Sequence, residues 1–444
     1  MENEAGRRYA ISDLLEMKRL AIGDGYRARN DELSTQGIPF ARAGNINVGF
    51  QFDNADFFPV ENLGRVGNKV SQPGDVVFTS KGTVGRFALV RDDTPRFVYS
   101  PQLCFWRSLD QEVIDSRFLY YWMCSREFYL QFKGVAGQTD MAEYVSLTDQ
   151  RRMHITVPQI GHQRAIAAIL GALDDKIELN RRMNETLEEL ARTIFKSWFV
   201  DFDPVRAKAD GRQPVGMDAA TAAFFPSRFV ESELGEIPEG WRGAGLGEWV
   251  QALSGGTPSK SDLSLWGGSL PWISPKVMND IHADEAEAWV TNAAIGNGTR
   301  LVPSGSTLVM VRGMGLHKCV RVSQARTDVT FNQDVKALVP RGVEPTLLLL
   351  ALLEGQTSLL KRVQSSGHGT GVLPSDILLA HPLYMPPADV QKRLVPQLDA
   401  MNERIAAGRA ENRTLVELRD LLLPKFISGE LRVPEAEKLA EAVL

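Results

Sequence analysis

Apolar residues recur every seven positions in two separate stretches of the chain. In the first stretch one series passes through Ile166, Leu173, Leu187 and Ile194. A companion series consists of Leu170, Ile177, Ala191 and Trp198. Paired apolar series with this period are typical of helices that pack together as a coiled coil. The pattern therefore predicts a long coiled-coil helix in this part of the chain.

A second stretch near the end of the sequence repeats the pattern. Its apolar positions are Leu394, Met401, Leu415 and Leu422, with the companions Leu398, Ile405 and Phe426. Prolines bracket the two stretches, at Pro158 and Pro204 and at 386–387 and Pro424. Pro396 lies inside the second pattern, so we expect a kink or a late start of the helix there. At 1.5 Å per residue, roughly forty helical residues form a rod about 60 Å long.

Both apolar stripes turn polar at mid-length. Asn180 and Asn184 interrupt the first, and Gly408 and Asn412 interrupt the second. If the helices pair antiparallel, these centres meet, and a buried asparagine in such a seam fixes the register at some cost in stability. We therefore predict that Asn180, Asn184 and Asn412 are register residues. The alternative is an exposed, frayed centre.

The two stretches belong to a repeat that extends over most of the chain. At one constant offset, Gln163 aligns with Gln391 and Asn184 with Asn412, and many apolar positions align as well. Chance is a poor explanation for this helical match.

A weaker match precedes each helical stretch. A Pro/Gly turn leads into a strand-like run, at 76–78 in the first copy and 307–310 in the second, and each run leads to a basic–Gly pair. Further β-rich segments are expected at 86–90 and 318–322. Chance remains an alternative for this part. The chain is predicted to be a tandem duplication of a variable β-rich part followed by a helical part.

Composition narrows the classes of protein that the chain can represent. Its 444 residues are 43% hydrophobic and 24% charged, with a formal net charge of −5 spread evenly along the sequence. No apolar run is long enough for a membrane span, and the polar N-terminus is unlike a signal peptide, so the cytoplasm is the expected compartment. Three scattered cysteines form neither a disulfide framework nor a Cys-x-x-Cys pair. The acidic balance argues against a generic DNA-coating protein.

Signatures of catalysis and of nucleotide binding are missing. The stretch 255–261 lacks the glycine before Lys260 that a phosphate-binding loop needs, and the glycines at 243–247 and 367–371 lack dinucleotide-binding spacing. The six histidines form no metal-binding cluster. Neither the Asn-Pro-Pro-aromatic motif of adenine methyltransferases nor a Gly-x-Ser-x-Gly motif is present. No cofactor is predicted, and a self-contained enzyme with an unrecognised site is a less favoured alternative.

Several phrases, in this order and spacing, resemble the specificity subunit of type I restriction–modification systems. The strongest lie in the helical blocks, Leu-Asp-Asp-Lys-Ile-Glu-Leu-Asn at 173–180 and Leu-Leu-Pro-Lys-Phe-Ile-Ser-Gly-Glu-Leu-Arg at 422–432. Others are Ser-Glu-Leu-Gly-Glu-Ile-Pro-Glu-Gly-Trp at 232–241, Ser-Gly-Gly-Thr-Pro-Ser at 254–259 and Trp-Ile-Ser-Pro at 272–275. The resemblance covers about residues 10–432.

The resemblance implies an α+β fold, in which two mixed α/β target-recognition domains are joined by two long antiparallel coiled-coil helices as a pseudo-twofold tandem repeat. The expected parts are a first recognition domain (1–158), a central helical region (159–203), a connector (204–240), a second recognition domain (241–386), a distal helical region (387–430) and a tail (431–444).

The resemblance also implies a subunit that is non-catalytic by itself. It would read a bipartite, asymmetric site in double-stranded DNA, one recognition domain per half-site, while the helical rod sets the gap. Two modification subunits that bind S-adenosylmethionine would methylate adenine N6, and two ATP-dependent restriction subunits would cleave DNA. The weak charge fits an adaptor that depends on its complex to hold DNA. The alternative is a coiled-coil scaffold whose globular ends bind proteins. The target sequence and the spacer length do not follow from the sequence.

Candidate DNA contacts are polar and basic side chains on loops and strand ends, because such groups read base edges or bind phosphates. The first copy offers Arg42, Asn45, Asn47, Lys81, Thr83, Arg86, Gln138 and Thr139. The second copy offers Ser274, Lys276, Arg312, His317, Lys318, His368 and Thr370. For each of them, a solvated surface side chain is the plainer interpretation. Gln102 and Gln333, at equivalent positions, are interpreted as structural hydrogen-bond donors.

Overall fold

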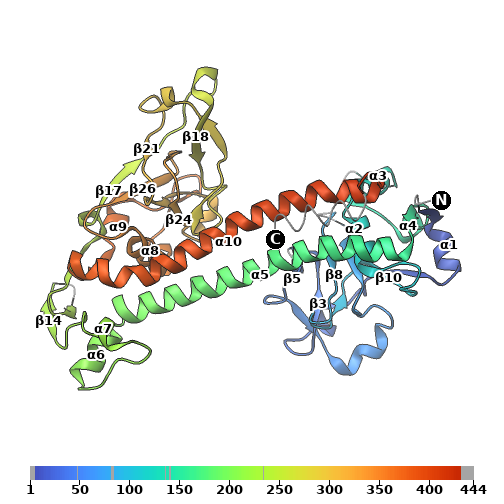
Figure 1. The fold of residues 1–444 in the computed structure, drawn as a ribbon, viewed down its shortest axis with the longest axis horizontal. Helices are drawn as coiled ribbons and strands as arrows, with labels where there is room; N and C mark the ends of the chain where they lie inside the picture. The colour runs from blue at the N-terminus through green and yellow to red at the C-terminus, as the bar shows by residue number, and fades with distance from the viewer. Residues whose placement is uncertain are drawn as a thin grey trace. The chain divides into compact units, whose positions relative to one another are not determined.

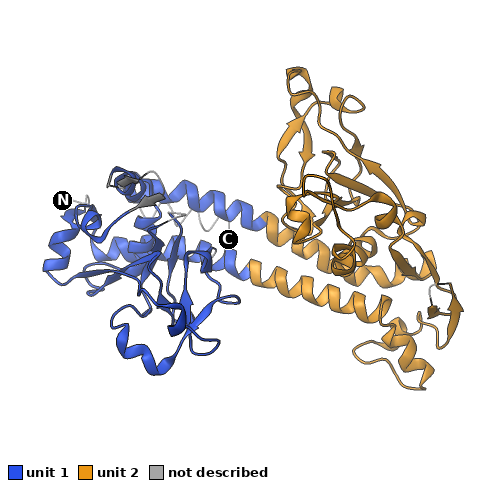
Figure 2. Ribbon diagram, turned by 180° about the vertical axis from the view of Figure 1, so that it is seen from behind, with its two compact units in different colours: residues 1–179, 411–444 blue, residues 180–410 orange. Residues whose placement is uncertain are grey.

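The computed structural model describes residues 6–47, 49–81, 85–135, 137–139, 142–233 and 235–431. They fold into two compact units (Figure 2). Unit 1 contains residues 1–179 and 411–444, and unit 2 contains residues 180–410. Unit 1 therefore combines two segments that are far apart in the sequence.

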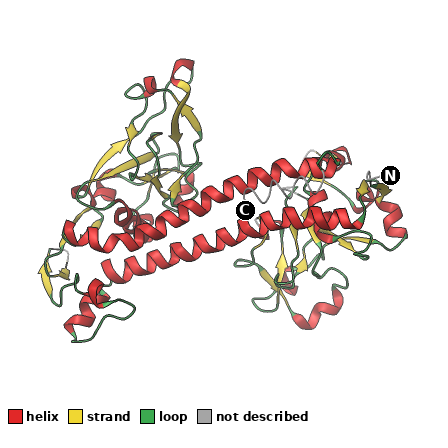
Figure 3. Ribbon diagram, in the orientation of Figure 1, coloured by secondary structure: helices red, strands yellow, loops and turns green. Residues whose placement is uncertain are grey.

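Unit 1 is built around a four-stranded antiparallel sheet (Figure 3). In spatial order its strands are β2 (Leu20–Asp24), β10 (Leu103–Ser108), β7 (Val76–Thr79) and β8 (Phe87–Leu89). In a second sheet, β3 (Ile38–Ala41) is antiparallel to β6 (Asp56–Phe58) and parallel to β9 (Val98–Tyr99). Smaller pairs are β1 (Arg7–Ala10) with β13 (His154–Val157), β4 (Ile46–Asn47) with β5 (Gly49–Phe50), and β11 (Gly137–Thr139) with β12 (Ala142–Tyr144). Its short helices are α1 (Ile11–Glu16), α2 (Ser116–Met123), α3 (Arg126–Val135) and α4 (Leu147–Arg151).

The largest core of unit 1 is aromatic at its centre. The Phe128 ring lies 5.9 Å from Trp106, 5.3 Å from Trp122 and 6.0 Å from Phe78 (centroid distances), edge-on to each. Such edge-to-face contacts add to the stabilisation from apolar burial. Three buried residues of the C-terminal part of the chain join this core: Leu415, Leu422 and Phe426.

Unit 2 contains a five-stranded sheet of β17 (Val250–Ser254), β26 (Val335–Pro340), β22 (Thr307–Met310), β24 (Val322–Ala325) and β19 (His282–Ala283). A four-stranded sheet contains β20 (Ala288–Val290), β18 (Trp266–Ile273), β25 (Val329–Phe331) and β21 (Leu301–Val302). Smaller sheets are β23 (Arg312–Gly313) with β28 (Gly371–Val372) and β27 (Gln364–Ser365), β16 (Arg242–Gly245) with β29 (Pro382–Met385), and β14 (Phe229–Ser232) with β15 (Gly235–Pro238). The short helices are α6 (Asp203–Ala209), α7 (Ala219–Ala222), the leucine-rich α8 (Pro345–Leu360) and α9 (Ser375–Leu379).

The two units repeat one sheet plan. The order β2-β10-β7-β8 in unit 1 corresponds to β17-β26-β22-β24 in unit 2, which adds β19. In the second sheet, β3 and β18 each have one antiparallel and one parallel neighbour. The strands predicted at 76–78 and 307–310 are β7 and β22, in equivalent places. The repeat in the sequence is therefore a repeat of topology.

One strand prediction in the second copy is wrong. The segment 86–90 contains β8, but of 318–322 only Val322 lies in a strand, β24. A short 3-10 turn, Met314–His317, precedes it and follows Gly313, whose φ of 141° is in the region that favours glycine. This extra turn delays the strand.

Two long helices carry the heptad pattern. They are α5 (Ile160–Phe199), with 40 residues, and α10 (Ala388–Ser428), with 41 residues, drawn in green and red in Figure 1. Within unit 1, Asn412 Nδ2 donates to the Ile177 carbonyl at 3.1 Å, and Arg419 Nη1 lies 2.9 Å from Asp174 Oδ1. Later residues of α10 thus meet earlier residues of α5, so the helices run antiparallel, as predicted.

Of the kink or late helix start expected at Pro396, the late start is wrong, and Pro424 does not end the helix. Pro396 and Pro424 both lie inside α10, which begins at Ala388 and ends at Ser428. A proline inside a helix costs about 3 kcal/mol, because it removes a hydrogen bond and crowds the preceding turn. The buried apolar residues on either side of the two prolines are Leu394, Val395, Leu398, Leu422 and Phe426. Burial of such side chains contributes about 1.5–3 kcal/mol each, which offsets the loss.

Equivalent glutamines tie each long helix to its unit. In unit 1, Gln163 accepts a hydrogen bond from the Asp115 amide (3.0 Å) and donates to the carbonyls of Val113 (3.0 Å) and Pro158 (2.8 Å). In unit 2, Gln391 accepts from the Glu344 amide (3.0 Å) and donates to the carbonyls of Gly342 (3.2 Å) and Pro386 (2.9 Å). Both side chains are buried. The repeat therefore extends to individual hydrogen bonds.

Candidate nucleic-acid interface

A concavity of about 440 Å³ lies in unit 2, beside the ends of β18 and β22. Three predicted DNA contacts line it: Ser274, Lys276 and Arg312. Its charged side chains are Lys260, Lys276, Arg312 and Arg321 against Glu287 and Asp334. The excess of cations suits a surface that approaches phosphates.

Glu287 is held in place by two of these predicted residues. The Ser274 hydroxyl donates to Glu287 Oε2, and Lys276 Nζ donates to Glu287 Oε1 at 2.6 Å. Ser274 is buried and also accepts from the Lys276 amide at 3.2 Å. The hydrogen bond from Lys276, followed by that from Ser274, lowers the pKa of Glu287. The carboxylate therefore stays ionised at neutral pH.

Arg312 projects from the edge of the same concavity. Its amide and that of Val311 donate to the Asp334 carbonyl, at 3.3 and 2.8 Å. Asn332 Oδ1 in turn accepts from the Asp334 amide at 3.0 Å, which fixes the turn beneath Arg312. The Arg312 side chain is exposed, and its guanidinium bonds no residue in the described ranges. It is therefore available to a ligand.

The other predicted contacts of the second copy lie on two neighbouring turns. His317 Nε2 is 2.9 Å from the Gly369 carbonyl, which joins the 314–318 turn to the turn that carries His368 and Thr370. Lys318 and His368 are exposed, and Thr370 is half-buried. The structure thus brings the two turns together, outside the lining of the concavity.

In unit 1, several predicted contacts hold the 42–47 loop together. Asn45 accepts from the Arg42 amide (2.8 Å) and donates to the Gln51 carbonyl (2.9 Å). Arg86 donates to the carbonyls of Ala43 (3.3 Å) and Ile46 (3.2 Å). Asn45 and Arg86 therefore shape the loop, since each bonds the protein's own backbone.

Other residues of that set remain turned to solvent. Arg42 forms an ion pair with Asp56 at 2.6 Å, with 48% of its side chain exposed. Asn47 and Lys81 are exposed. Thr83 and the side chains of Gln138 and Thr139 lie outside the described part of the structure, although the backbone of Gln138 pairs with Glu143 in the β11–β12 hairpin.

Gln102 and Gln333 are both structural, but as acceptors. Gln102 Oε1 accepts from the Ala43 amide at 3.2 Å, and Gln333 Oε1 accepts from the Thr257 hydroxyl at 2.7 Å. The expectation that they act as donors is therefore not met by these bonds. Gln333 is exposed and lines the concavity, so it belongs to the candidate interface as well.

The polar centres of the helices pack inside the seam. In unit 2, Asn180 and Asn184 are buried, and a Cβ on Gly408 would lie 2.6 Å from Asn184 Oδ1. Only glycine leaves room for this amide. In unit 1, Asn412 bonds the Ile177 carbonyl of the opposite helix. The register role of the three asparagines stays a prediction.

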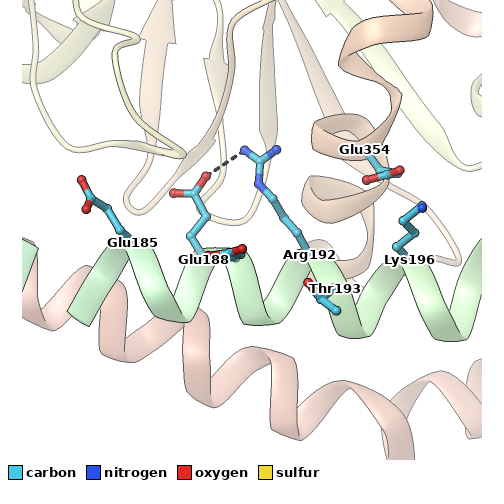
Figure 4. Close-up of a pocket in the computed structure, with 7 residues that line it drawn as sticks. Glu185, Glu188, Arg192, Thr193, Lys196 and Glu354 are labelled. Atoms are coloured by element: carbon cyan, nitrogen blue, oxygen red, sulfur yellow. Dashed lines mark hydrogen bonds and ion pairs between the residues drawn. The ribbon is translucent and has the colours of Figure 1, made fainter. Parts of the chain in front are cut away.

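A second hollow of unit 2 offers no nucleic-acid interface. It has a volume of about 400 Å³ and lies between α5 and α8 (Figure 4). Its lining is Glu185, Glu188, Glu189, Arg192, Thr193, Lys196 and Glu354. Arg192 Nη2 donates to Glu188 Oε1 at 2.7 Å. Because acids outnumber bases, this hollow repels phosphates.

Other kinds of site find little support. In the part of the chain that the structure describes, no group of three or more His, Cys, Asp or Glu side chains could hold a metal ion. Among the same residues no helix is both long and apolar enough to cross a membrane. Burial lowers the pKa of His282 and His381, so both imidazoles are neutral packing groups.

Glu287, Arg321 and Asp334 are charged members of the concavity that sequence reasoning missed, because nothing in their local sequence marks them. Lys260 was considered only as part of a phosphate-binding loop. A better signal was available: the phrases at 254–259 and 272–275 that carry the family resemblance supply Thr257, Trp272 and Ser274 to the lining.

Comparison with known proteins agrees with the repeated architecture. The family model described as type I restriction modification DNA specificity domain matches residues 9–189 and 238–415. The type I restriction enzyme HindI specificity subunit of Haemophilus influenzae is 25% identical over 464 residues, covering 94% of this chain and 100% of the relative. The MjaIX specificity subunit of Methanocaldococcus jannaschii is 24% identical over 374 residues, covering 83% and 80%. The crystal structure of the type I restriction-modification system S subunit from M. genitalium has the same fold, with a TM-score of 0.59, 14% identity and coverage of 96% and 97%. Since the family model matches both copies of the repeat, the chain belongs to the family of type I restriction–modification DNA specificity subunits.

Proposed function

We propose that this chain directs a type I restriction–modification complex to a bipartite, asymmetric site in double-stranded DNA. The recognition domains would span 1–158 and 241–386, the helical regions 159–203 and 387–430, with 204–240 as the connector. Each recognition domain reads one half-site. The complex acts in the cytoplasm, where its DNA substrate lies.

The observation that carries the proposal is the repeated sheet plan with different polar side chains on it. The same strand order recurs in both units, yet Lys81 of the first copy corresponds to Arg312 of the second, and the second copy adds the turn Met314–His317, which is followed by Lys318. One fold with two sets of contacts is what an asymmetric DNA sequence requires, because sequence is read by side chains at base edges.

The helices supply a means of fixing the gap between half-sites. Each is about 60 Å long at 1.5 Å per residue, which exceeds the roughly 34 Å that separates sites one DNA turn apart. The buried asparagines and Gly408 favour a single register. A fixed register would give a fixed spacer.

We assign adenine methylation and DNA cleavage to partner subunits. Two modification subunits that bind S-adenosylmethionine would methylate adenine N6 after extruding the base from the duplex. Two restriction subunits would use ATP to cleave unmodified DNA. Membership in the specificity family supports this division, and the chain itself would be non-catalytic.

The test is co-expression with the cognate modification subunit, followed by methylome sequencing. We expect methylated adenine at one bipartite motif, and no methylation by the chain alone. Exchanging residues 10–156 for another recognition domain should change one half-site and leave the other intact. Unmodified DNA in the presence of both subunits would contradict the proposal and favour the scaffold alternative.

The spacer is tested by inserting one heptad into Ile166–Trp198, with a matching insertion in Met401–Phe426. The gap between half-sites should lengthen while both half-sites stay the same. An unchanged gap in a folded variant would refute the helices as the measure of spacing.

A further inference from the structure

The concavity of unit 2 contains one feature that phosphate binding does not explain. Glu287 lies among four cations, with 27% of its side chain exposed. A carboxylate at a DNA-facing surface repels the phosphate backbone, so its presence lowers affinity unless it contacts something else. Base edges offer such a partner, because the amino groups of cytosine and adenine donate hydrogen bonds in the major groove.

The geometry presents the Glu287 carboxylate as an oriented acceptor. Its backbone amide donates to the Trp272 carbonyl at 3.1 Å, which ties it to the end of β18. The buried Ser274 hydroxyl and Lys276 Nζ each bond one carboxylate oxygen. An ionised carboxylate has about four acceptor positions, so each oxygen retains capacity for a further donor.

Lys276 makes a carboxylate at this place compatible with DNA. Its ammonium is bonded to Glu287, and 78% of its side chain is exposed. It therefore neutralises the carboxylate locally while it remains able to reach a phosphate. The exposed Arg312 on the same concavity adds a fork of donors that suits guanine O6 and N7.

We infer that Glu287 is a specificity-determining residue, whose carboxylate accepts a hydrogen bond from the exocyclic amino group of a cytosine or an adenine in one half-site. Ser274 and Lys276 are its positioning residues. This inference rests on the proposed function and assigns a role within one recognition surface.

The experiment compares Glu287→Ala with Glu285→Ala in the complex with the modification subunit. Glu285 is an exposed acid outside the lining of the concavity, so it controls for loss of one negative charge. For Glu287→Ala, we expect the preference for one base pair of one half-site to fall roughly 5- to 150-fold in methylome sequencing. The other half-site and the spacer should not change. Ser274→Ala should weaken the same preference to a smaller extent.

Modified duplexes then distinguish the two bases. At the affected position, 2-pyrimidinone replaces cytosine, or purine replaces adenine, so that only the amino group is removed. The unsubstituted complex should bind one of these duplexes more weakly than the natural duplex. The Glu287→Ala complex should bind that modified duplex as well as it binds the natural one.

Two outcomes would overturn the inference while leaving the proposed function intact. In one, the Glu287→Ala complex methylates the same motif with unchanged base preferences, whatever the overall extent of methylation. In the other, it relaxes the sequence no more than Glu285→Ala does. If the unsubstituted complex methylates no specific motif, the proposed function fails and the inference fails with it.

Discussion

Replacing Gln391 by leucine should destabilise unit 2 by at least about 3 kcal/mol. Leucine has a similar volume, so the substitution removes hydrogen bonds without opening a large cavity. Three backbone groups lose their partner: the Glu344 amide and the carbonyls of Gly342 and Pro386. Each buried polar group left without a partner costs about 1–3 kcal/mol. Since whole domains are stable by about 5–15 kcal/mol, this loss is large.

Hydrogen exchange measured by mass spectrometry is the suitable assay, because a chain of two units need not unfold in one transition. In the Gln391→Leu variant, amides around Glu344 should exchange faster, while those around Asp115 in unit 1 remain as they were. Gln163→Leu should give the reverse result. Gln397→Leu, an exposed position on the same helix, is the matched control. The reasoning is refuted if hydrogen exchange around Glu344 in Gln391→Leu gives a free energy of opening within about 0.5 kcal/mol of that in the unsubstituted protein, since hydrogen bonds this well buried should contribute more.

Three further predictions concern the seam, a buried ion pair and pH. Gly408→Ala should destabilise the seam, although alanine has a helix propensity about 1 kcal/mol better than that of glycine, because the added Cβ would lie 2.6 Å from Asn184 Oδ1. In a double-mutant cycle, Asn184→Ala should recover the stability that Gly408→Ala loses. Additive effects of the two substitutions would refute the contact. Arg107→Leu should cost about 3–5 kcal/mol in urea unfolding, because it leaves the buried Asp75 carboxylate without its cation; an effect below about 1 kcal/mol would contradict this. Burial lowers the pKa of His282 below its ordinary value of 6.5, so the unfolded chain binds the proton more readily and unit 2 should lose stability as pH falls below 6.5. His282→Gln should flatten that pH dependence, and an unchanged slope would assign it to other groups.

The sequence predicted the long helices and the central strands well, because their signals are local. A heptad period needs no knowledge of the partner helix, and a Pro/Gly turn before an apolar run marks a strand such as β7 or β22. The predictions of helix ends at the prolines were wrong because they depend on contacts that are not local. Whether a helix starts late at Pro396 or ends at Pro424 depends on what the flanking apolar residues pack against, which is a property of the folded unit.

Residue types alone predicted the candidate site only in part. Ser274, Lys276 and Arg312 do share one concavity. Asn45 and Arg86 have equally suitable side chains, but each bonds backbone carbonyls of its own unit. Glu287 escapes prediction because a carboxylate is not an expected contact for the phosphate backbone of DNA. Distinguishing these cases requires the tertiary contacts.

The division of the units along the chain has a consequence for synthesis on the ribosome. Unit 1 includes residues 411–428 of α10, and its core contains Leu415, Leu422 and Phe426. Residues 1–179 emerge first, but the core that they form lacks Leu415, Leu422 and Phe426 until almost the whole chain has been translated. The nascent first unit must therefore wait with an incomplete apolar core, a state that invites chaperone binding or aggregation. In this protein the unit that begins to form first is the one that is completed last.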